Sequence, residues 1–378
     1  MTRAEHPSAD GALSRFFRSD VAGSWVLVLA VGIALLWANG PWWSTTYASV
    51  WLHPVHVGGR AFQDFATVRD WVNGGLMAVF FLVVGLEIGR ERRHGDLADT
   101  RTAVVPVAGA LGGMAGAGLV YAAVTHGGPG ASGWGIPMAT DIAFALGALA
   151  LLGRRVPPGL RVVLLTLAVA DDIGSVVVLA VFYSSRTFAP ALAGVVAGLL
   201  VPGVARAGTG RPDRTQTADP AAALETRVAP WSAFLVLPLF AVANAGITFH
   251  RGILAPPGAT AVFAGVALAR VVGKLAGITL ACLLVVRLGL GRLPDGVRWR
   301  HVAGGAAVAG IGFTVPLLIA ELAFLHDPPL VTAAELGLFA GSTLAFAVGA
   351  AILWWAGPGG PEAQVAPREE DDGPRILW

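Results

Sequence analysis

Two adjacent carboxylates, Asp171 and Asp172, stand in the middle of an apolar stretch that runs from Val162 to Tyr183. A stretch of this length predicts a membrane-spanning helix that holds both acids near the bilayer midplane. A charge at that depth costs roughly 2.5–3.5 kcal/mol on insertion scales, and intramembrane acids usually serve a function. The pair therefore indicates a site that exchanges a proton for a cation. The alternative is that protonated acids are merely lodged between helices.

Lys274 is the only lysine of the chain, and the other 25 of its 26 Lys and Arg residues are arginines. It lies near the centre of the apolar stretch 259–286. A buried lysine can lose its proton, whereas arginine stays charged in proteins. We therefore expect Lys274 to act as a titratable amine or as a counter-ion for Asp171 or Asp172. Arg270 lies one helical turn earlier, where it would share the lysine's face. There it either repels the lysine's charge or extends toward the membrane interface.

Two further apolar stretches are interrupted by glycine and proline: residues 135–147 read GIPMATDIAFALG, and residues 309–317 read AGIGFTVPL. Such interruptions at comparable places in two halves of a membrane protein predict broken helices that cross at a binding site. Broken helices expose unpaired backbone groups and helix-dipole ends, which nearby charges compensate. We expect Thr140 and Asp141 to lie in the first break. Asp141 would then serve a half-helix N-terminus, and Lys274 a half-helix C-terminus.

Membrane helices must position these residues, because 55% of the 378 residues are hydrophobic and only 13% are charged. This composition excludes a soluble globular protein and predicts an all-α polytopic membrane protein. We count ten spans. They are Val21–Ala38, Trp71–Ile88, Thr102–Val124, Ile136–Leu152, Val162–Tyr183, Phe188–Val204, Trp231–Ile247, Ala259–Val286, Val302–Ala320 and Val331–Trp355.

Charge bias sets the predicted topology. If the N-terminus is cytoplasmic, 20 of the 26 Lys and Arg residues lie inside, four lie in outside loops and two lie in the membrane. Basic residues gather in cytoplasmic loops, so both termini are predicted to lie inside. Residues 1–20 would be a cytoplasmic N-terminus, 21–356 the membrane domain, and 357–378 a polar, disordered cytoplasmic tail. In the outer loop 41–70, residues 55–62 are predicted to form a β-hairpin.

Six stretches in a fixed order resemble the NhaA-type sodium/proton antiporters. They are NGGLMAVFFLVVGLEIGRE from Asn73, ATDIAFALGALALLG from Ala139, LAVADDIG from Leu167, LPLFAVANAGI from Leu237, VGKLAGI from Val272 and GIGFT from Gly310. The resemblance implies inverted repeats with two broken crossing helices, and a repeat core at about 102–183 and 259–355. It also implies a bacterial inner-membrane protein that transports Na⁺ or Li⁺ against H⁺, without a cofactor and without nucleic acid.

The resemblance also implies roles for single residues. Asp172 looks like the main carboxylate for Na⁺ and protons, Asp171 like its partner, Lys274 like the lysine paired with the site, and Thr140 and Asp141 like the unwound-segment residues. The outer loop around 55–62 would resemble the element through which family members dimerise.

Histidine-based pH sensing is not expected in this chain. The family's inner-loop histidines near the seventh span are replaced by Thr226 and Ala229. The acids Glu87, Glu91 and Glu225 remain and are the candidates for a pH response.

A second departure is in the number of helices. Family members usually have twelve, and here two are missing between Tyr183 and Ala191, outside the repeat core.

We therefore expect a secondary antiporter, not an enzyme, in which protons and a cation compete for the paired aspartates. Three alternatives stay open: a sodium-coupled carrier of an organic solute, an intramembrane aspartyl protease, and an inactive shortened family member. The protease needs two aspartates that converge from separate helices. Asp171 and Asp172 are neighbours about 100° apart on one helix, so only an Asp141–Asp172 pair would serve.

Overall fold

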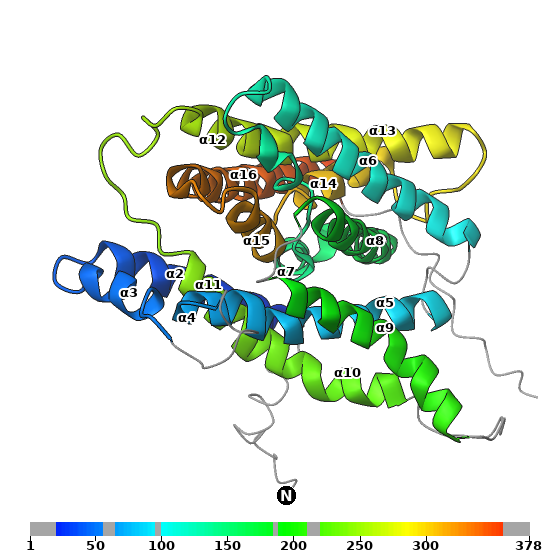
Figure 1. Ribbon diagram of the computed structural model, residues 1–378. Coiled ribbons are helices and arrows are strands. Elements are labelled where there is room, and N and C mark those ends of the chain that lie inside the picture. The colour runs from blue at the N-terminus through cyan, green and yellow to red at the C-terminus, as the bar shows by residue number, and fades with distance from the viewer. Residues whose placement is uncertain (1–19, 56–64, 95–99, 184–187, 210–219, 358–378) are drawn as a thin grey trace, which may run out of the picture.

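The computed structural model describes residues 20–55, 65–94, 100–183, 188–209 and 220–357 (Figure 1). The α-helices are α2 (Asp20–Asn39), α3 (Ser44–Trp51), α4 (Val68–Asp70), α5 (Met77–His94), α6 (Thr100–Thr125), α7 (Ile142–Leu152), α8 (Pro158–Phe182), α9 (Ala189–Thr209), α10 (Pro220–Trp231), α11 (Leu237–Asn244), α12 (Ala259–Leu268), α13 (Lys274–Arg287), α14 (Trp299–Val308), α15 (Thr314–Ala323) and α16 (Pro328–Ala356). Short 3₁₀ turns are η4 (Ala131–Gly135) and η5 (Gly153–Arg155), and π-helical turns are η2 (Trp71–Leu76), η6 (Ser232–Val236) and η7 (Ala269–Gly273).

The predicted all-α membrane architecture is confirmed. Among the described residues, seven helical segments are long and apolar enough to cross a membrane, and 142–152, 189–201 and 314–323 form shorter apolar helices. Together they coincide with the ten predicted spans. Within the described residues the only β-type pairing is an isolated antiparallel bridge between Pro54 and Thr67. The predicted hairpin at 55–62 and the predicted tail at 357–378 lie outside the described residues except for Val55 and Gly357, and 1–19 and 184–187 also lie outside them.

The helices form two groups, which lie one above the other in Figure 1. The panel contains α2–α5 and α9–α11, with α5 packed on α9 and α2 on α11. The bundle contains α6–α8 and α12–α16, with α6 packed on α13, and α12 and α14 on α16. Both halves of the bundle run in the order long helix, interrupted helix, long helix. The panel and the bundle meet where α2 contacts α7, α5 contacts α8 and α11 contacts α15.

Glycines bring α13, which carries Lys274, close to α6. A Cβ atom on Gly112 would lie 2.5 Å from the carbonyl oxygen of Gly277, and one on Gly116 would lie 2.5 Å from that of Gly273. Neither distance is open to a real side chain, so this helix pair depends on glycine on both sides. The small-xxx-small spacing in α6 therefore marks a tight helix contact, as such spacing does in membranes.

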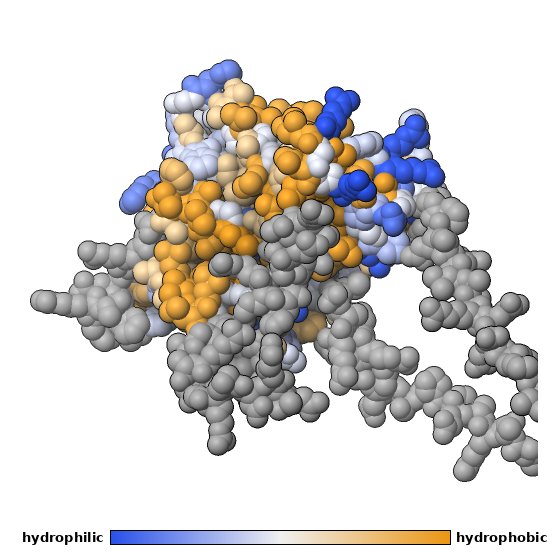
Figure 2. All heavy atoms as spheres, turned by 90° about the vertical axis from the view of Figure 1, so that its right-hand side faces the viewer, coloured by the Kyte–Doolittle hydropathy of each residue, from blue (hydrophilic) through white to orange (hydrophobic). Residues whose placement is uncertain are grey.

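The outward-facing surface of the helices suits lipid. Leu29, Leu36 and Leu119 have exposed fractions of 63%, 73% and 71%. Figure 2 shows broad apolar areas on one face, with hydrophilic side chains gathered in separate groups. Large exposed apolar patches are rare on soluble proteins. Next to the hydrocarbon chains of lipids, exposed apolar side chains avoid the free-energy cost that they have in water. This surface therefore agrees with a multi-pass membrane protein.

Candidate ion-binding site

Two unwound segments cross in the middle of the bundle, as the glycine and proline interruptions predict. Residues 136–141 separate η4 from α7, and residues 309–313 separate α14 from α15. The backbone N–H of Asp141 donates to the carbonyl oxygen of Ile311 at 3.0 Å. The hydroxyl of Thr140 donates to the carbonyl oxygen of Ala309 at 2.8 Å. These two bonds join the segments and satisfy backbone groups that lipid could not.

Asp141 serves two helix N-termini at this crossing. One carboxylate oxygen accepts from the N–H of Phe144 at 3.3 Å, which caps α7. The other accepts from the hydroxyl of Thr314 at 3.1 Å, in the first turn of α15. A carboxylate is stabilised at the positive end of a helix dipole. The predicted role of Asp141 at a half-helix N-terminus is therefore confirmed, and it extends to both half-helices.

Arg270 binds the carbonyl groups of the crossing. Its side chain is fully buried, and its Nε donates to the carbonyl oxygen of Gly310 at 2.8 Å, while Nη2 donates to that of Ala139 at 3.2 Å. One guanidinium thus holds one carbonyl on each unwound segment. A Cβ on Gly312 would overlap Nη2 and would lie 2.6 Å from the backbone carbonyl oxygen of Ala139, so only glycine leaves room for the arginine and for the other unwound segment. The expectation that Lys274 serves this role is wrong, and Arg270 does not extend to the interface.

Arg270 and Lys274 serve different partners at the same crossing. Arg270 lies inside η7, and Lys274 is the first residue of α13. Their donors reach neighbouring residues of the first unwound segment, the carbonyl oxygen of Ala139 and the hydroxyl of Thr140. The two side chains therefore point to the same region, as the expected shared face requires, and the charge of Arg270 acts on Lys274.

Lys274 pairs with Asp171. The amine donates to Asp171 Oδ2 at 2.7 Å and to the Thr140 hydroxyl at 3.0 Å. The N–H of Thr140 also donates to Asp171 Oδ2, at 2.8 Å. Both charged side chains are fully buried. Asp171 Oδ1 is buried too and has no hydrogen-bond partner in the described part of the chain, so one oxygen of this carboxylate is still able to accept.

Asp172 differs from Asp171 in its contacts. It follows Asp171 on α8, is half-buried, and makes no hydrogen bond or ion pair with any residue that the structure describes. It lies in the electrostatic field of Asp171 and of Glu87, which belongs to α5 of the panel. Asp172 is therefore the acid that remains available, at the boundary where α5 contacts α8. Carboxylate oxygens are the ligands that hard cations prefer.

The three candidates for a pH response lie in the panel. Glu225 on α10 forms an ion pair with Arg90 on α5, with 3.4 Å between Oε1 and Nε. Glu87 is half-buried on α5, and its negative charge acts on Asp172. The side chain of Glu91 lies outside the described residues. The structure thus brings Glu87 toward the ion site, and it places Glu225 in a contact within the panel.

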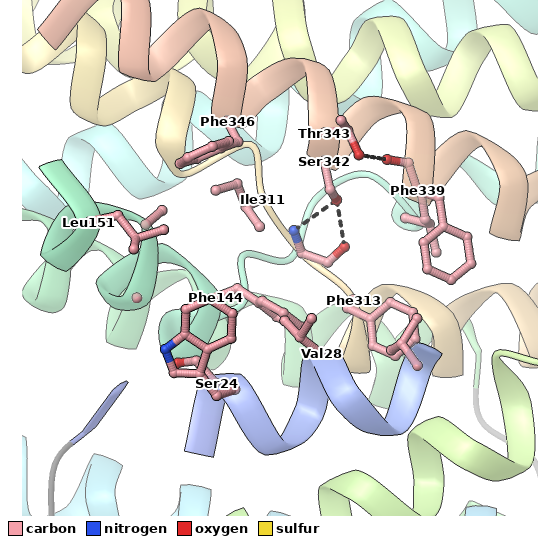
Figure 3. A pocket seen from close by; sticks show the side chains of 16 residues that line it. Ser24, Val28, Phe144, Leu151, Ile311, Phe313, Phe339, Ser342, Thr343 and Phe346 are labelled. Atoms are coloured by element: carbon pink, nitrogen blue, oxygen red, sulfur yellow. Dashed lines mark hydrogen bonds between the residues drawn. The ribbon is translucent and has the colours of Figure 1, made fainter. Parts of the chain in front are cut away.

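A cavity of about 380 Å³ borders the crossing (Figure 3). It lies where α2 faces α7, α16 and the second unwound segment, and its lining is almost entirely apolar, with Val28, Phe144 and Ile311 among the side chains. The Ser342 hydroxyl in its wall donates to the carbonyl oxygen of Gly312 at 3.0 Å. None of the described side chains that line it is charged, so it is a gap between panel and bundle and does not suit a cation.

Comparison with known proteins places this geometry among relatives. A family model described as Na⁺/H⁺ antiporter 1 matches residues 14–192 and 187–353. The chain is 42% identical over 392 residues to the Na(+)/H(+) antiporter NhaA of Acidovorax sp. (strain JS42), which covers 91% of this chain and 92% of that protein. It is 38% identical over 421 residues to Na(+)/H(+) antiporter NhaA 2 of Sorangium cellulosum, covering 90% of each. It is 40% identical over 379 residues to Na(+)/H(+) antiporter NhaA 1 of Klebsiella pneumoniae, covering 90% of this chain and 95% of the other.

The comparisons also bear on the reduced helix count. The two pieces of the family match meet at residues 187–192, at the point where the sequence lacks two expected spans. The alignment with the Acidovorax relative is 392 residues long, more than the 378 residues of this chain, although it covers only 91% of it. Part of that relative therefore has no counterpart here.

Proposed function

The chain belongs to the Na⁺/H⁺ antiporter 1 family, and from this membership and the site geometry we propose that it exports Na⁺ or Li⁺ in exchange for H⁺. As a member it is a transporter and not an enzyme. The observation that carries the proposal is the contrast between two adjacent acids. Asp171 is held by Lys274 and Thr140, with one oxygen unpaired, whereas Asp172 is half-buried and lacks a partner among the described residues.

The exchange follows from competition for these oxygens. Na⁺ binds between the Asp172 carboxylate and Oδ1 of Asp171, and it displaces a proton because both ions use the same lone pairs. Burial makes a carboxylate hold a proton more firmly when no cation is present. The ion pair between Lys274 and Asp171 can weaken as Na⁺ arrives, because Asp171 then shares its charge with two cations. Thr140 keeps Asp171 in place through its backbone N–H.

Alternating access would come from rocking of the bundle against the panel. The ion site lies entirely in the bundle, so the cation would move with it. The boundary next to Asp172 and the apolar cavity beside α2 are the places where the two groups would slide. Glu87, on the panel side of this boundary, would guide cations toward Asp172, and Glu225 and Glu91 would respond to internal pH.

We also propose the placement of the chain. The arginine-rich segments put both termini in the cytoplasm of a bacterium, with 21–356 as the transport domain in the inner membrane. The segment around 55–62 would join two copies in a homodimer. The two missing spans lie outside the segments that build the crossing, so the ion chemistry does not require them.

The alternative functions fit the geometry less well. Asp141 is engaged at two helix N-termini, so it does not form a catalytic dyad with Asp172. An organic solute would need a polar cavity, whereas the cavity beside the crossing is apolar.

Everted membrane vesicles test the function, including that of an inactive shortened protein. A respiration-driven proton gradient should be partly dissipated when Na⁺ or Li⁺ is added, and should be unaffected by choline. Absence of a Na⁺ or Li⁺ response in vesicles with verified expression would refute the proposal.

A further inference from the structure

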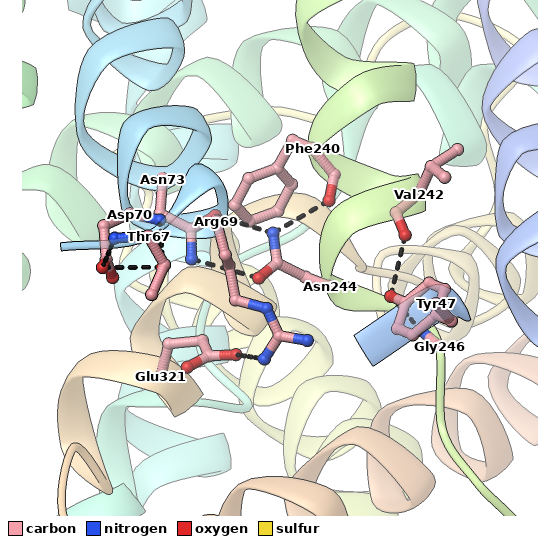
Figure 4. Close-up of polar contacts among 10 residues, drawn as sticks. All are labelled: Tyr47, Thr67, Arg69, Asp70, Asn73, Phe240, Val242, Asn244, Gly246 and Glu321. Atoms are coloured by element: carbon pink, nitrogen blue, oxygen red, sulfur yellow. Dashed lines mark hydrogen bonds and ion pairs between the residues drawn. The ribbon is translucent and has the colours of Figure 1, made fainter. Parts of the chain in front are cut away.

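An ion pair joins the panel to the bundle at the end of the molecule that the charge bias places outside. Arg69 lies in α4 of the panel, and Glu321 lies in the last turn of α15 in the bundle. Arg69 Nη1 and Glu321 Oε1 are 3.8 Å apart (Figure 4). The pair lies near the contact of α11 with α15, one of the few places where the two groups meet.

A second carboxylate shares this arginine. Glu335 on α16 of the bundle has an exposed fraction of 6% and makes no hydrogen bond or ion pair with any residue in the described ranges. Its electrostatic neighbours are Glu321 and Arg69. Two carboxylates of the bundle therefore face one guanidinium of the panel. Neither acid takes part in the ion site, which lies at the crossing.

The arginine is held on the panel side by a rigid framework (Figure 4). Thr67 and Asp70 form a capping box around α4, so the Asp70 carboxylate is occupied by the N–H and hydroxyl of Thr67 at 2.8 and 2.7 Å. One turn later, Asn73 and Asn244 exchange side-chain hydrogen bonds at 3.0 and 2.7 Å and tie this segment to α11. Arg69 thus moves with the panel.

The contact with Glu321 is loose. A hydrogen-bonded ion pair has its heavy atoms about 2.7–2.9 Å apart, as the pair of Lys274 with Asp171 does at 2.7 Å. At 3.8 Å, Arg69 and Glu321 attract each other without a direct hydrogen bond, and Arg69 Nε and Glu321 Oε1 both lack hydrogen-bond partners in the described part of the structure. Such a pair holds two bodies together and can still separate.

We propose that Arg69 and Glu321 form a latch that closes the outer side of the transporter and opens in each cycle, with Glu335 taking over the guanidinium when Glu321 leaves. The Arg69 side chain is only 27% exposed, so loss of its counter-ion is unfavourable, and Glu335 on the moving body supplies a second carboxylate for it. This inference rests on the proposed exchange between panel and bundle. Family membership assigns no role to these three residues.

Reversible cross-linking tests whether the latch must open. In a Cys282→Ala background, Arg69→Cys and Glu321→Cys are joined by bifunctional methanethiosulfonate reagents of increasing length, which form a reducible disulfide with each cysteine, until mass spectrometry verifies the link. The shortest effective link should reduce Na⁺-driven exchange at least tenfold, and a reducing agent should restore it. The control pair is Arg155→Cys with Trp354→Cys, because Arg155 stacks on Trp354 at 3.3 Å and both belong to the bundle. Linking that pair should leave exchange unchanged.

The outcomes separate this inference from the proposed function. Absence of exchange in the unlinked Cys282→Ala parent, with verified folding, counts against the function. Full exchange after verified linkage of positions 69 and 321 overturns the latch.

Charge reversal is the second measurement. Arg69→Glu and Glu321→Arg should each lower the exchange rate at least threefold, and the double variant should recover most of it. A double variant no better than the worse single variant would also overturn the latch. Glu335→Gln should slow exchange without lowering the melting temperature, and an unchanged rate would remove Glu335 from the proposal.

Discussion

Replacing Arg270 with methionine should loosen the crossing of the two unwound segments. The change removes hydrogen bonds to the carbonyl oxygens of Gly310 and Ala139, at 2.8 and 3.2 Å. Side-chain hydrogen bonds within membrane proteins are worth about 0.6 kcal/mol on average and up to about 1.7 kcal/mol. Two bonds therefore amount to about 1–3 kcal/mol. Removal of a buried charge returns part of that amount, so we expect a loss of stability toward the lower end.

A substitution at Gly312 tests the same contact without relying on the absolute stability loss of Arg270→Met. Gly312→Ala in the wild-type background places a methyl group where Arg270 Nη2 lies, so it should destabilise strongly. In an Arg270→Met background the flexible thioether can move aside, but the added Cβ still lies 2.6 Å from the backbone carbonyl oxygen of Ala139, so the same substitution should cost less without becoming neutral. Contacting residues give such non-additive double-mutant cycles. Arg270→Lys keeps the charge but not the planar fork, so it should not bridge both carbonyls.

The assay is thermal unfolding of the purified protein in detergent, with Na⁺-driven exchange in proteoliposomes measured beside it. Arg270→Met should melt earlier and exchange more slowly, because the carbonyls of the crossing lose the group that fixes them. An Arg270→Met protein with the wild-type melting temperature would refute the reasoning. So would a Gly312→Ala penalty that is equal in both backgrounds.

Three further predictions concern the ion site. Asp172→Asn should insert normally yet abolish exchange, because an amide neither releases a proton nor supplies a charged ligand; near-normal exchange in vesicles would exclude the assigned role. Lys274→Arg should keep the fold but lose much of the exchange or of its charge movement, since arginine cannot lose its proton. Lys274→Ala should instead leave Asp171 unpaired, at a cost in stability that can reach about 3–5 kcal/mol. Melting temperature, exchange rate and charge moved per cycle distinguish the two variants. Finally, the pH of half-activation should fall by up to about one unit for each tenfold rise in Na⁺, as one-to-one competition requires; a profile fixed in pH would point to a separate sensor, with Glu87 first.

The sequence was sufficient for the spans and for the two interruptions that cross in the bundle. The acids of α8, the lysine and the glycine–proline interruptions are visible locally, because each violates the apolar pattern around it. Which aspartate the lysine holds was not predictable, since Asp171 and Asp172 differ by one position, and only the packing of α13 and of α8 against α6 decides. The role of Arg270 depended on carbonyls 40 and 131 residues away.

Glu335 was missed although its signal is present. It lies in the apolar span 331–355, where an acid is as unusual as in α8, but it lacks an adjacent acid and an interruption that would draw attention to it. Of its two neighbours, Glu321 lies at the end of the preceding helix and Arg69 comes from a distant part of the chain. A site built from three elements has no local pattern.

The ionic groups at the crossing also bear on why such a carrier does not return empty. Asp141, Asp171 and Asp172 bring three negative charges, and Arg270 and Lys274 bring two positive ones, within one buried region. At their ordinary charges these five side chains leave the vacant crossing with one excess negative charge, and a single bound Na⁺ or proton cancels it. Displacing a net charge through hydrocarbon is far more expensive than displacing a neutral assembly. The cost of desolvating a net charge therefore disfavours reorientation of the empty carrier. Because Arg270 stays charged, one monovalent ion is enough to balance the charges of the crossing.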